Sequence, residues 1–227
     1  MPETVAPLPP HLDAVRTRFE AAWQRAGAGP IGVFSVMIGP DSPALYVLLV
    51  HKSLDAFASL PERVAADAEY EKAAAPYTNA EATAPAFVRI ETSLMRSFES
   101  IPKLELPFSG GENARRSRIF ELRTYENPTE KAQRAKMRMF SEMGEIEIFK
   151  RVGLTPVFFS RTLIGPHMPS IVYMLVHENM AGREKSWSNF SADPEWQKVR
   201  ATPGYSDADI VSNITTVFLR PAGYSQI

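Results

Sequence analysis

The chain has 227 residues, of which 44% are hydrophobic and 22% charged, and a net charge of −1. This composition is typical of a globular protein and excludes a disordered one. A nearly neutral chain argues against a nucleic-acid partner, and no run approaches the roughly 18 apolar residues of a membrane span, so we expect no membrane insertion. Cysteine is absent, and no metal-spaced histidine cluster or phosphate-binding loop occurs, so we expect no metal and no cofactor.

The first residues, 1–10, are proline-rich and lack the basic and apolar regions of a signal peptide. We therefore expect a cytoplasmic protein, unless an export or organelle signal has been removed. Residues 1–96 predict an N-terminal module, with a helix over 11–27, a helical region over 53–74, and strands over 31–38, 44–50 and 86–95. No alternating strand precedes His11, so this module is predicted to lack its first strand, either naturally or because the sequence begins after it.

A linker is predicted over residues 97–117, which combine prolines with a polar, turn-forming stretch. Residues 118–227 then predict a complete C-terminal module. Its strands are expected over 118–125, 157–163, 171–176 and 210–219. A helix capped by Asn127 or Thr129 ends at Gly153, and further helices cover 181–190 and begin at Asp193–Pro194.

The two modules repeat each other. Ile38–Pro43 aligns with Ile164–Pro169 without a gap, and the alignment continues through residue 72 of the first copy. Later, Arg96 aligns with Arg220. Gly39–Pro40 and Gly165–Pro166 are predicted to form the same turn, so residues 31–96 and 155–220 should adopt matching folds.

The element order of the second module, β-α-β-β-α-β, predicts the ferredoxin-like arrangement and the α+β class. Such a sheet carries helices on one face only, and its other face needs a cover. A second copy of the module supplies one, so we expect the two ferredoxin-like modules to pack sheet to sheet as an α+β barrel with the helices outside.

Four stretches resemble the NIPSNAP family: Phe120–Tyr125, the Gly165–Pro166 turn, Asp193–Trp196 and Asn213–Pro221. The resemblance covers residues 118–221 well and 31–96 more weakly. It implies the dimeric α+β barrel superfamily, in agreement with the element order. It implies no general catalytic activity. The best-known eukaryotic members of the family are mitochondrial and are linked to vesicle traffic and to mitochondrial quality control. Relatives on the same fold include small monooxygenases and haem-handling enzymes, although a fold does not transfer function.

Glu121, Arg123 and Tyr125 are the main candidates for a ligand site. Strand alternation places them on one face, and we expect that face to point into the barrel while Phe120 and Leu122 face the helices. A carboxylate, a guanidinium and a phenol inside a barrel need each other or a ligand, so a self-satisfied Glu–Arg pair is the alternative. His51 and His177 occupy equivalent places in the repeat, each just after a buried strand. They are either acid–base or ligand groups or strand-end structural histidines.

These observations predict a NIPSNAP-type binding or interaction protein without catalysis. The alternative is a small oxygenase or isomerase, or a handler of haem or another hydrophobic ligand, that uses the barrel interior. The aromatic residues Trp187, Phe190 and Trp196 are better explained as core than as a haem pocket. An unpaired sheet edge in the first module also predicts a homo-oligomer, and a small apolar molecule is the candidate ligand.

Overall fold

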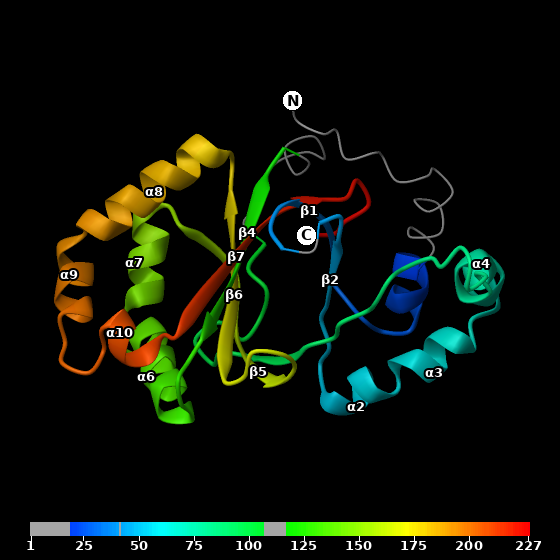
Figure 1. Ribbon diagram of the computed structural model, residues 1–227, viewed down its shortest axis with the longest axis horizontal. Coiled ribbons are helices and arrows are strands. Elements are labelled where there is room, and N and C mark those ends of the chain that lie inside the picture. Colours follow the sequence, from blue (N-terminus) through cyan, green and yellow to red (C-terminus); the bar gives the residue numbers. More distant parts are fainter. Residues whose placement is uncertain (1–18, 41, 107–116) are drawn as a thin grey trace. The chain divides into compact units, whose positions relative to one another are not determined.

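The computed structural model describes residues 19–40, 42–106 and 117–227, and these form two compact units (Figure 1). The described part of the first unit comprises residues 19–35, 43–91 and 222–227. The second unit comprises residues 36–42 and 92–221, apart from position 41 and residues 107–116, which lie outside the described residues. Both units mix α-helices with antiparallel strands. The class predicted from the sequence is confirmed.

In the first unit, residues 31–35 of β1 (Ile31–Ile38) pair with β2 (Leu45–Leu49) as a hairpin, in which Ile31 lies opposite Leu49 and Ser35 opposite Leu45. A helix precedes the hairpin, and its described part covers residues 19–25. The predicted start of this helix, and any strand upstream of it, lie outside the described residues. On the edge of β1, the C-terminal residues 222–227 add backbone hydrogen bonds to Ile31 and Val33.

Three helices complete this unit: α2 (Leu54–Ala58), α3 (Leu60–Ala65) and α4 (Ala68–Thr78). The Asp67 side chain caps α4 by accepting from two backbone N–H groups at its first turn. The small core of the unit joins the helix at 19–25 to α3 through the buried residues Ala22, Ala26, Ala28, Leu60 and Val64.

The second unit is the ferredoxin-like module. Its strands are β4 (Ile119–Glu126), β5 (Thr155–Ile164), β6 (Ser170–His177) and β7 (Asn213–Pro221), and they are all antiparallel in the order β7-β4-β6-β5. The helices are α6 (Glu130–Ser141), α7 (Glu145–Val152), α8 (Met180–Ala192), α9 (Pro194–Arg200) and α10 (Asp207–Ile210). They cover one face of this sheet (Figure 1).

Local signals in the sequence explain how these helices begin and end. The predicted caps are confirmed: Thr129 begins α6, Asp193 with Pro194 begins α9, and Gly153 ends α7 at a φ of 89°. The single helix expected between Thr129 and Gly153 is wrong, because it divides into α6 and α7. Gly144 lies between them at a φ of 82°, in the left-handed region that interrupts a helix.

The core of the second unit lies between the helices and the sheet. The predicted stripe Met139, Ile146 and Phe149 is buried there, and Phe190 and Trp196 join it. The ring of Phe159 stacks on that of Tyr173 with centroids 4.7 Å apart. The interpretation of these aromatic residues as core is confirmed.

The predicted strand over residues 86–95 is mostly wrong. Residues 86–93 form no strand, and β3 covers only Leu94–Ser97. β3 pairs with β5 in the second unit, with Arg96 opposite Arg161, and so extends that sheet to β7-β4-β6-β5-β3. In the second module the corresponding strand, β7, pairs with the first strand, β4, but no first strand of the first module occurs among the described residues.

The two predicted glycine turns also differ. Gly165 has a φ of 155°, and a Cβ there would lie 2.7 Å from Ser93 Oγ. Gly39 has no such φ, but a Cβ would lie 2.8 Å from Val217 Cγ1. Glycine is therefore required at position 165 both for its backbone conformation and for lack of space, and at position 39 for lack of space alone.

Candidate functional site

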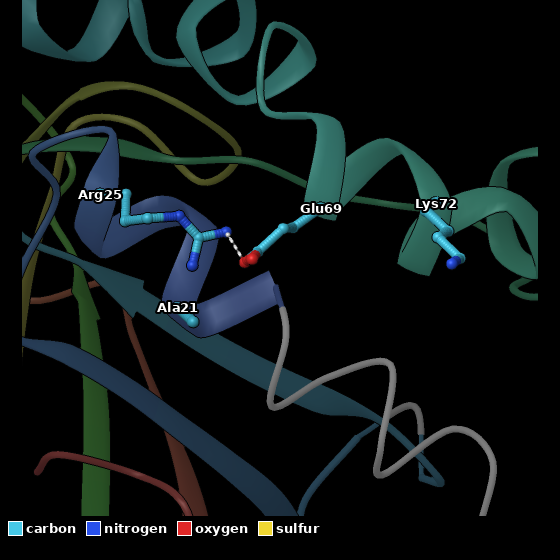
Figure 2. Close-up of a pocket in the computed structure, with 4 residues that line it drawn as sticks. All are labelled: Ala21, Arg25, Glu69 and Lys72. Carbon is cyan, nitrogen blue, oxygen red and sulfur yellow. Dashed lines mark ion pairs between the residues drawn. The ribbon is translucent and has the colours of Figure 1, made fainter.

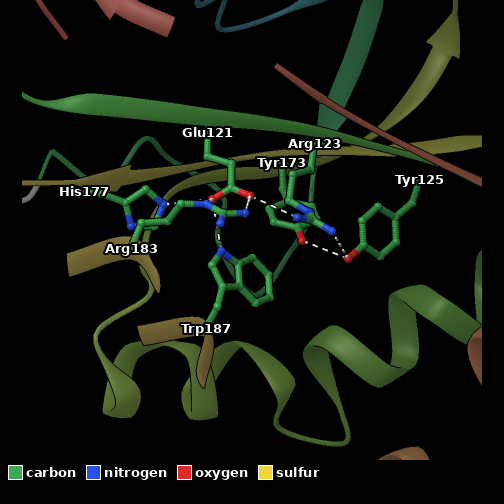
Figure 3. A network of polar contacts seen from close by, with 7 residues as sticks. All are labelled: Glu121, Arg123, Tyr125, Tyr173, His177, Arg183 and Trp187. Atoms are coloured by element: carbon green, nitrogen blue, oxygen red, sulfur yellow. Dashed lines mark hydrogen bonds and ion pairs between the residues drawn. The ribbon is translucent and has the colours of Figure 1, made fainter. Parts of the chain in front are cut away.

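Glu121, Arg123 and Tyr125 share one face of β4, as the strand period requires, but the face is opposite to the predicted one. Figure 3 shows their side chains directed toward the helices. Tyr125 belongs to the core between helices and sheet, and Glu121 contacts Trp187 on α8. The expectation that they point into a barrel while Phe120 and Leu122 face the helices is wrong. Both faces of β4 carry large apolar groups, so hydrophobicity alone does not distinguish them.

Glu121 is the centre of this buried polar network. Its side chain has no exposed surface, and it accepts from Arg123 Nη1 at 2.9 Å and from Trp187 Nε1 at 3.0 Å. Arg183 on α8 donates through Nε at 2.8 Å and Nη2 at 2.9 Å. His177 Nε2 lies 3.0 Å from the same carboxylate and acts as a donor to it, because an ionised carboxylate only accepts. Four side chains therefore saturate one carboxylate.

Arg123 connects this carboxylate to two tyrosines. Its Nη2 donates to Tyr125 Oη at 3.3 Å, and Tyr173 Oη donates to the same oxygen at 3.1 Å. The guanidinium also lies over the ring of Trp187, 4.8 Å from its centroid. Only 14% of the Arg123 side chain is exposed, and its Nε is a buried donor without a partner.

The network holds Glu121 in its charged form. Burial by itself raises the pKa of this carboxyl. Hydrogen bonds from His177, Arg183 and Trp187, together with the positive charge of Arg123, outweigh burial. The pKa of Glu121 therefore lies well below its ordinary value of 4.5.

The pKa values of Arg123 and Tyr173 shift in the direction that keeps the guanidinium charged and the phenol neutral. Burial lowers the pKa of Arg123, but the nearby Tyr173, Tyr125 and Glu121 raise it further, so it lies above its ordinary value. Burial raises the pKa of Tyr173 well above 10.0. The site therefore holds a charged pair of Glu121 and Arg123 beside a neutral Tyr173.

A second buried ion pair lies beneath the same core. Lys136 Nζ on α6 contacts Glu145 Oε2 on α7 at 3.0 Å, and each side chain is only 2% exposed. Burial lowers the pKa of Lys136, but the carboxylate of Glu145 outweighs it and raises that pKa. The ammonium also lies 4.5 Å from the ring centroid of Phe140. This pair fixes α6 against α7 around the break at Gly144.

His51, the remaining predicted site residue, belongs to the first unit, and its ring packs edge-on against Phe57 with centroids 5.5 Å apart. Burial, followed by the charge of Arg63, lowers its pKa. His177 is 5% exposed and bonded to Glu121, so the two equivalent histidines have different surroundings. The structure gives His51 no place in the network of Glu121.

Sequence reasoning missed Arg183 and Tyr173, and it treated Trp187 only as core. Arg183 and Trp187 are four residues apart on α8, and therefore on one helical face. An arginine and an indole on the same inward face signal a buried acceptor opposite them. That spacing was the available clue.

The first unit has a surface recess of about 330 Å³ lined by Ala21, Arg25, Glu69 and Lys72 (Figure 2). Arg25 contacts Glu69 at 3.3 Å and Asp67 at 2.7 Å. The charged side chains that line the recess are therefore exposed and of both signs, and none of them is a buried reactive group. Across the described ranges, no cluster of three potential metal ligands occurs, and no helix is long and apolar enough to cross a membrane.

The family model described as NIPSNAP matches residues 5–97 and 120–226. The two matches confirm the repeat that the sequence showed. No curated protein matches the chain.

Several solved structures are similar to this chain. A NIPSNAP-like domain protein from Burkholderia xenovorans is 22% identical, with a TM-score of 0.44 over 49% of this chain and 91% of that one. A proposed monooxygenase from Lactobacillus acidophilus is 9% identical, with a TM-score of 0.54 over 93% and 89%. Another from Fusobacterium nucleatum is 7% identical, with a TM-score of 0.55 over 92% and 85%. At these identities the last two likenesses concern the fold alone.

Proposed function

The chain belongs to the NIPSNAP family, and from that premise we propose that it is a non-catalytic binding protein whose second module serves as a rigid scaffold. The observation that carries this proposal is the saturation of Glu121 by four protein side chains. A carboxylate with all its acceptor positions filled by the protein has none left for a substrate. A fully satisfied buried network instead fixes how helices pack on a sheet.

The enzyme alternative requires an open cavity lined by Arg123, Tyr125 and a histidine. In the structure the guanidinium of Arg123 is covered by Trp187, and His177 is bonded to Glu121. General acid–base catalysis also needs a group that exchanges protons near the working pH. The fixed charge of Glu121 and the raised pKa of Tyr173 do not meet that need. Neither Glu121 nor Tyr173 is therefore suited to act as a general acid or base here.

Native mass spectrometry of the full chain, purified from its own cells, tests the proposal. We expect polypeptide mass only, alone or in complexes with other polypeptides, and no small molecule retained in stoichiometric amount. The variant Arg123→Ala should have the same ligand-free mass and a lower melting temperature, because it removes part of a structural network.

Arg134→Ala is the matched control, since Arg134 is exposed on α6 and pairs only weakly with Glu130 at 3.5 Å. It should change neither the mass nor the melting temperature. A small molecule that the wild-type protein retains and Arg123→Ala loses, with the melting temperature unchanged, would overturn the proposal. That result would place a ligand site at Arg123.

A further inference from the structure

The segment from residue 86 to residue 93 has the composition of a strand, but it belongs to no sheet in the part of the chain that the structure describes. It reads Ala86–Phe–Val–Arg–Ile–Glu–Thr–Ser93, and every residue from 81 to 93 is exposed. Val88 is 93% exposed, Ile90 65% and Phe87 47%. Branched and aromatic side chains favour strands, and leaving three of them in water forgoes the free energy of burying them. The exposed apolar side chains therefore indicate that this segment binds another polypeptide.

The internal repeat shows what kind of partner the segment lacks. Since Arg96 aligns with Arg220, residues 89–97 correspond to β7 (Asn213–Pro221). In the second module, the first half of β7 pairs with β4, with Ile214 opposite Tyr125 and Thr216 opposite Arg123. In the first module, only the end of the corresponding segment, β3, is paired. Residues 90–93 thus correspond to a paired stretch of β7, but they pair with no strand among the described residues.

We propose that residues 87–93 pair in antiparallel fashion with the same residues of a second copy of this chain. The pairing places Ile90 opposite Ile90 at a two-fold axis and Arg89 opposite Glu91 of the other copy. Val88 then faces Thr92, so Val88, Ile90 and Thr92 lie on one face of the new ribbon, and Phe87, Arg89 and Glu91 lie on the other. This surface deepens the proposed binding function and rests on it.

The charges of Arg89 and Glu91 favour this register over the alternative registers shifted by one or two residues. A shift of two residues in either direction along the partner sets Arg89 directly against Arg89 or Glu91 against Glu91, which is unfavourable. Registers between these set a charged side chain opposite an apolar one, so the two faces no longer match. Arg89 and Glu91 now form an ion pair within one chain at 2.7 Å. In the dimer they exchange that contact for the equivalent one across the axis.

The limits of the pairing also follow from the sequence. Pro85 has no backbone N–H and so ends the ribbon on one side, while β3 continues it on the other. A single short strand from each copy is far smaller than the roughly 20–30 residues a side of a standard interface. We therefore expect a weak dimer that dissociates on dilution.

Cysteine cross-linking of the otherwise cysteine-free chain tests the register. Residues directly opposite in an antiparallel pair have Cα atoms about 4.5–5.5 Å apart, within the range of a disulfide. The variant Ile90→Cys should therefore oxidise to a disulfide-linked dimer. Ile164→Cys is matched to it in exposure, 66% against 65%, and should cross-link at least about tenfold more slowly, because residue 164 lies outside the paired segment and does not face its own copy there.

Val88→Cys controls for exposure within the segment. Residue 88 is more exposed than residue 90, yet in the proposed register it lies about 13 Å from its own copy, too far for a disulfide. Cross-linking of Ile90→Cys with little at Val88→Cys supports the proposal. Equal rates at the three positions, or no cross-linking at any of them, would overturn it.

A charge exchange tests the same contact without cross-linking, by analytical ultracentrifugation at about 100 µM. Arg89→Glu and Glu91→Arg should each be monomeric, because each opposes like charges across the axis. An equimolar mixture of the two should dimerise, since every opposed pair is then of opposite sign. A mixture that stays monomeric while the wild-type chain dimerises would refute this register.

These measurements report only on residues 87–93, whereas ligand retention reports on the network of Glu121. Failure to dimerise with no retained ligand would refute this surface and leave the binding function standing. Retention of a ligand that depends on Arg123 would refute the binding function whatever the oligomeric state.

Discussion

Replacing Glu121 with glutamine removes the charge at the centre of the buried network and preserves its shape. Arg123 and Arg183, which are 14% and 21% exposed, then lose the carboxylate that each contacts at 2.8–2.9 Å. The glutamine also directs an NH₂ group at donors that need an acceptor. Removing one partner of a buried ion pair typically costs about 3–5 kcal/mol. At roughly 2–4 °C per kcal/mol for a chain of this length, the melting temperature should fall by about 6–20 °C.

Urea unfolding followed by far-UV circular dichroism and tryptophan fluorescence measures this loss. Glu105→Gln is the matched control, since it removes a carboxylate that pairs with Lys150 at 3.1 Å where both side chains are well exposed. Such surface pairs contribute about 0–1 kcal/mol. A free energy of unfolding within about 1 kcal/mol of wild type for Glu121→Gln would refute the interpretation of the network as structural.

Acid provides a second measure of the same effect. Because the pKa of Glu121 in the folded protein lies below its ordinary value of 4.5, the unfolded chain binds a proton there more readily. The stabilisation is therefore complete above about pH 4.5 and is lost as the pH falls toward the folded pKa. The difference in stability between wild type and Glu121→Gln should shrink as the pH decreases below 4.5. A difference that grows in acid would contradict the assigned sign.

Three further substitutions test neighbouring parts of the second module by thermal and urea unfolding. Arg123→Ala should destabilise less than Glu121→Gln, because Glu121 keeps Arg183 as a counter-charge; a larger loss would contradict this. Lys136→Met should cost about 3–5 kcal/mol by leaving Glu145 buried without its partner, whereas Lys136→Met with Glu145→Leu should recover most of it. Gly144→Ala should cost about 1–2 kcal/mol from backbone strain alone, since φ is 82° and a Cβ there meets nothing within 4 Å. An unchanged stability would show that the helix break tolerates a side chain.

The face of β4 illustrates the limit of sequence reasoning. A period of two shows that Glu121, Arg123 and Tyr125 share a side, and it does so with no knowledge of the fold. It does not show which side, because Phe120 and Leu122 are as apolar as the helix-facing positions. Arg183 and Trp187, which decide the question, lie some 60 positions later in the chain. Their meeting with Glu121 depends on how α8 crosses the sheet.

The partner of a strand is likewise a tertiary property. Residues 86–95 carry strand-forming side chains, but such propensity measures how well a segment fits a sheet that already exists. Leu94–Ser97 pair with β5, whereas residues 86–93 form no strand in the described part of the chain. The local signals of Leu94–Ser97 and of the residues before it do not differ enough to predict that division.

The sequence by itself determined the tandem repeat, the ferredoxin-like order of the second module and the caps at Thr129, Asp193 and Gly153. These features follow from local backbone chemistry and from periodicity, which act over a few residues. Only the tertiary structure decided that Glu121 is a saturated structural anchor, because three of its four donor side chains come from β6 and α8, two elements distant in the chain. A buried carboxylate becomes a ligand site or a structural anchor according to whether the protein itself supplies its donors, and that is settled by packing.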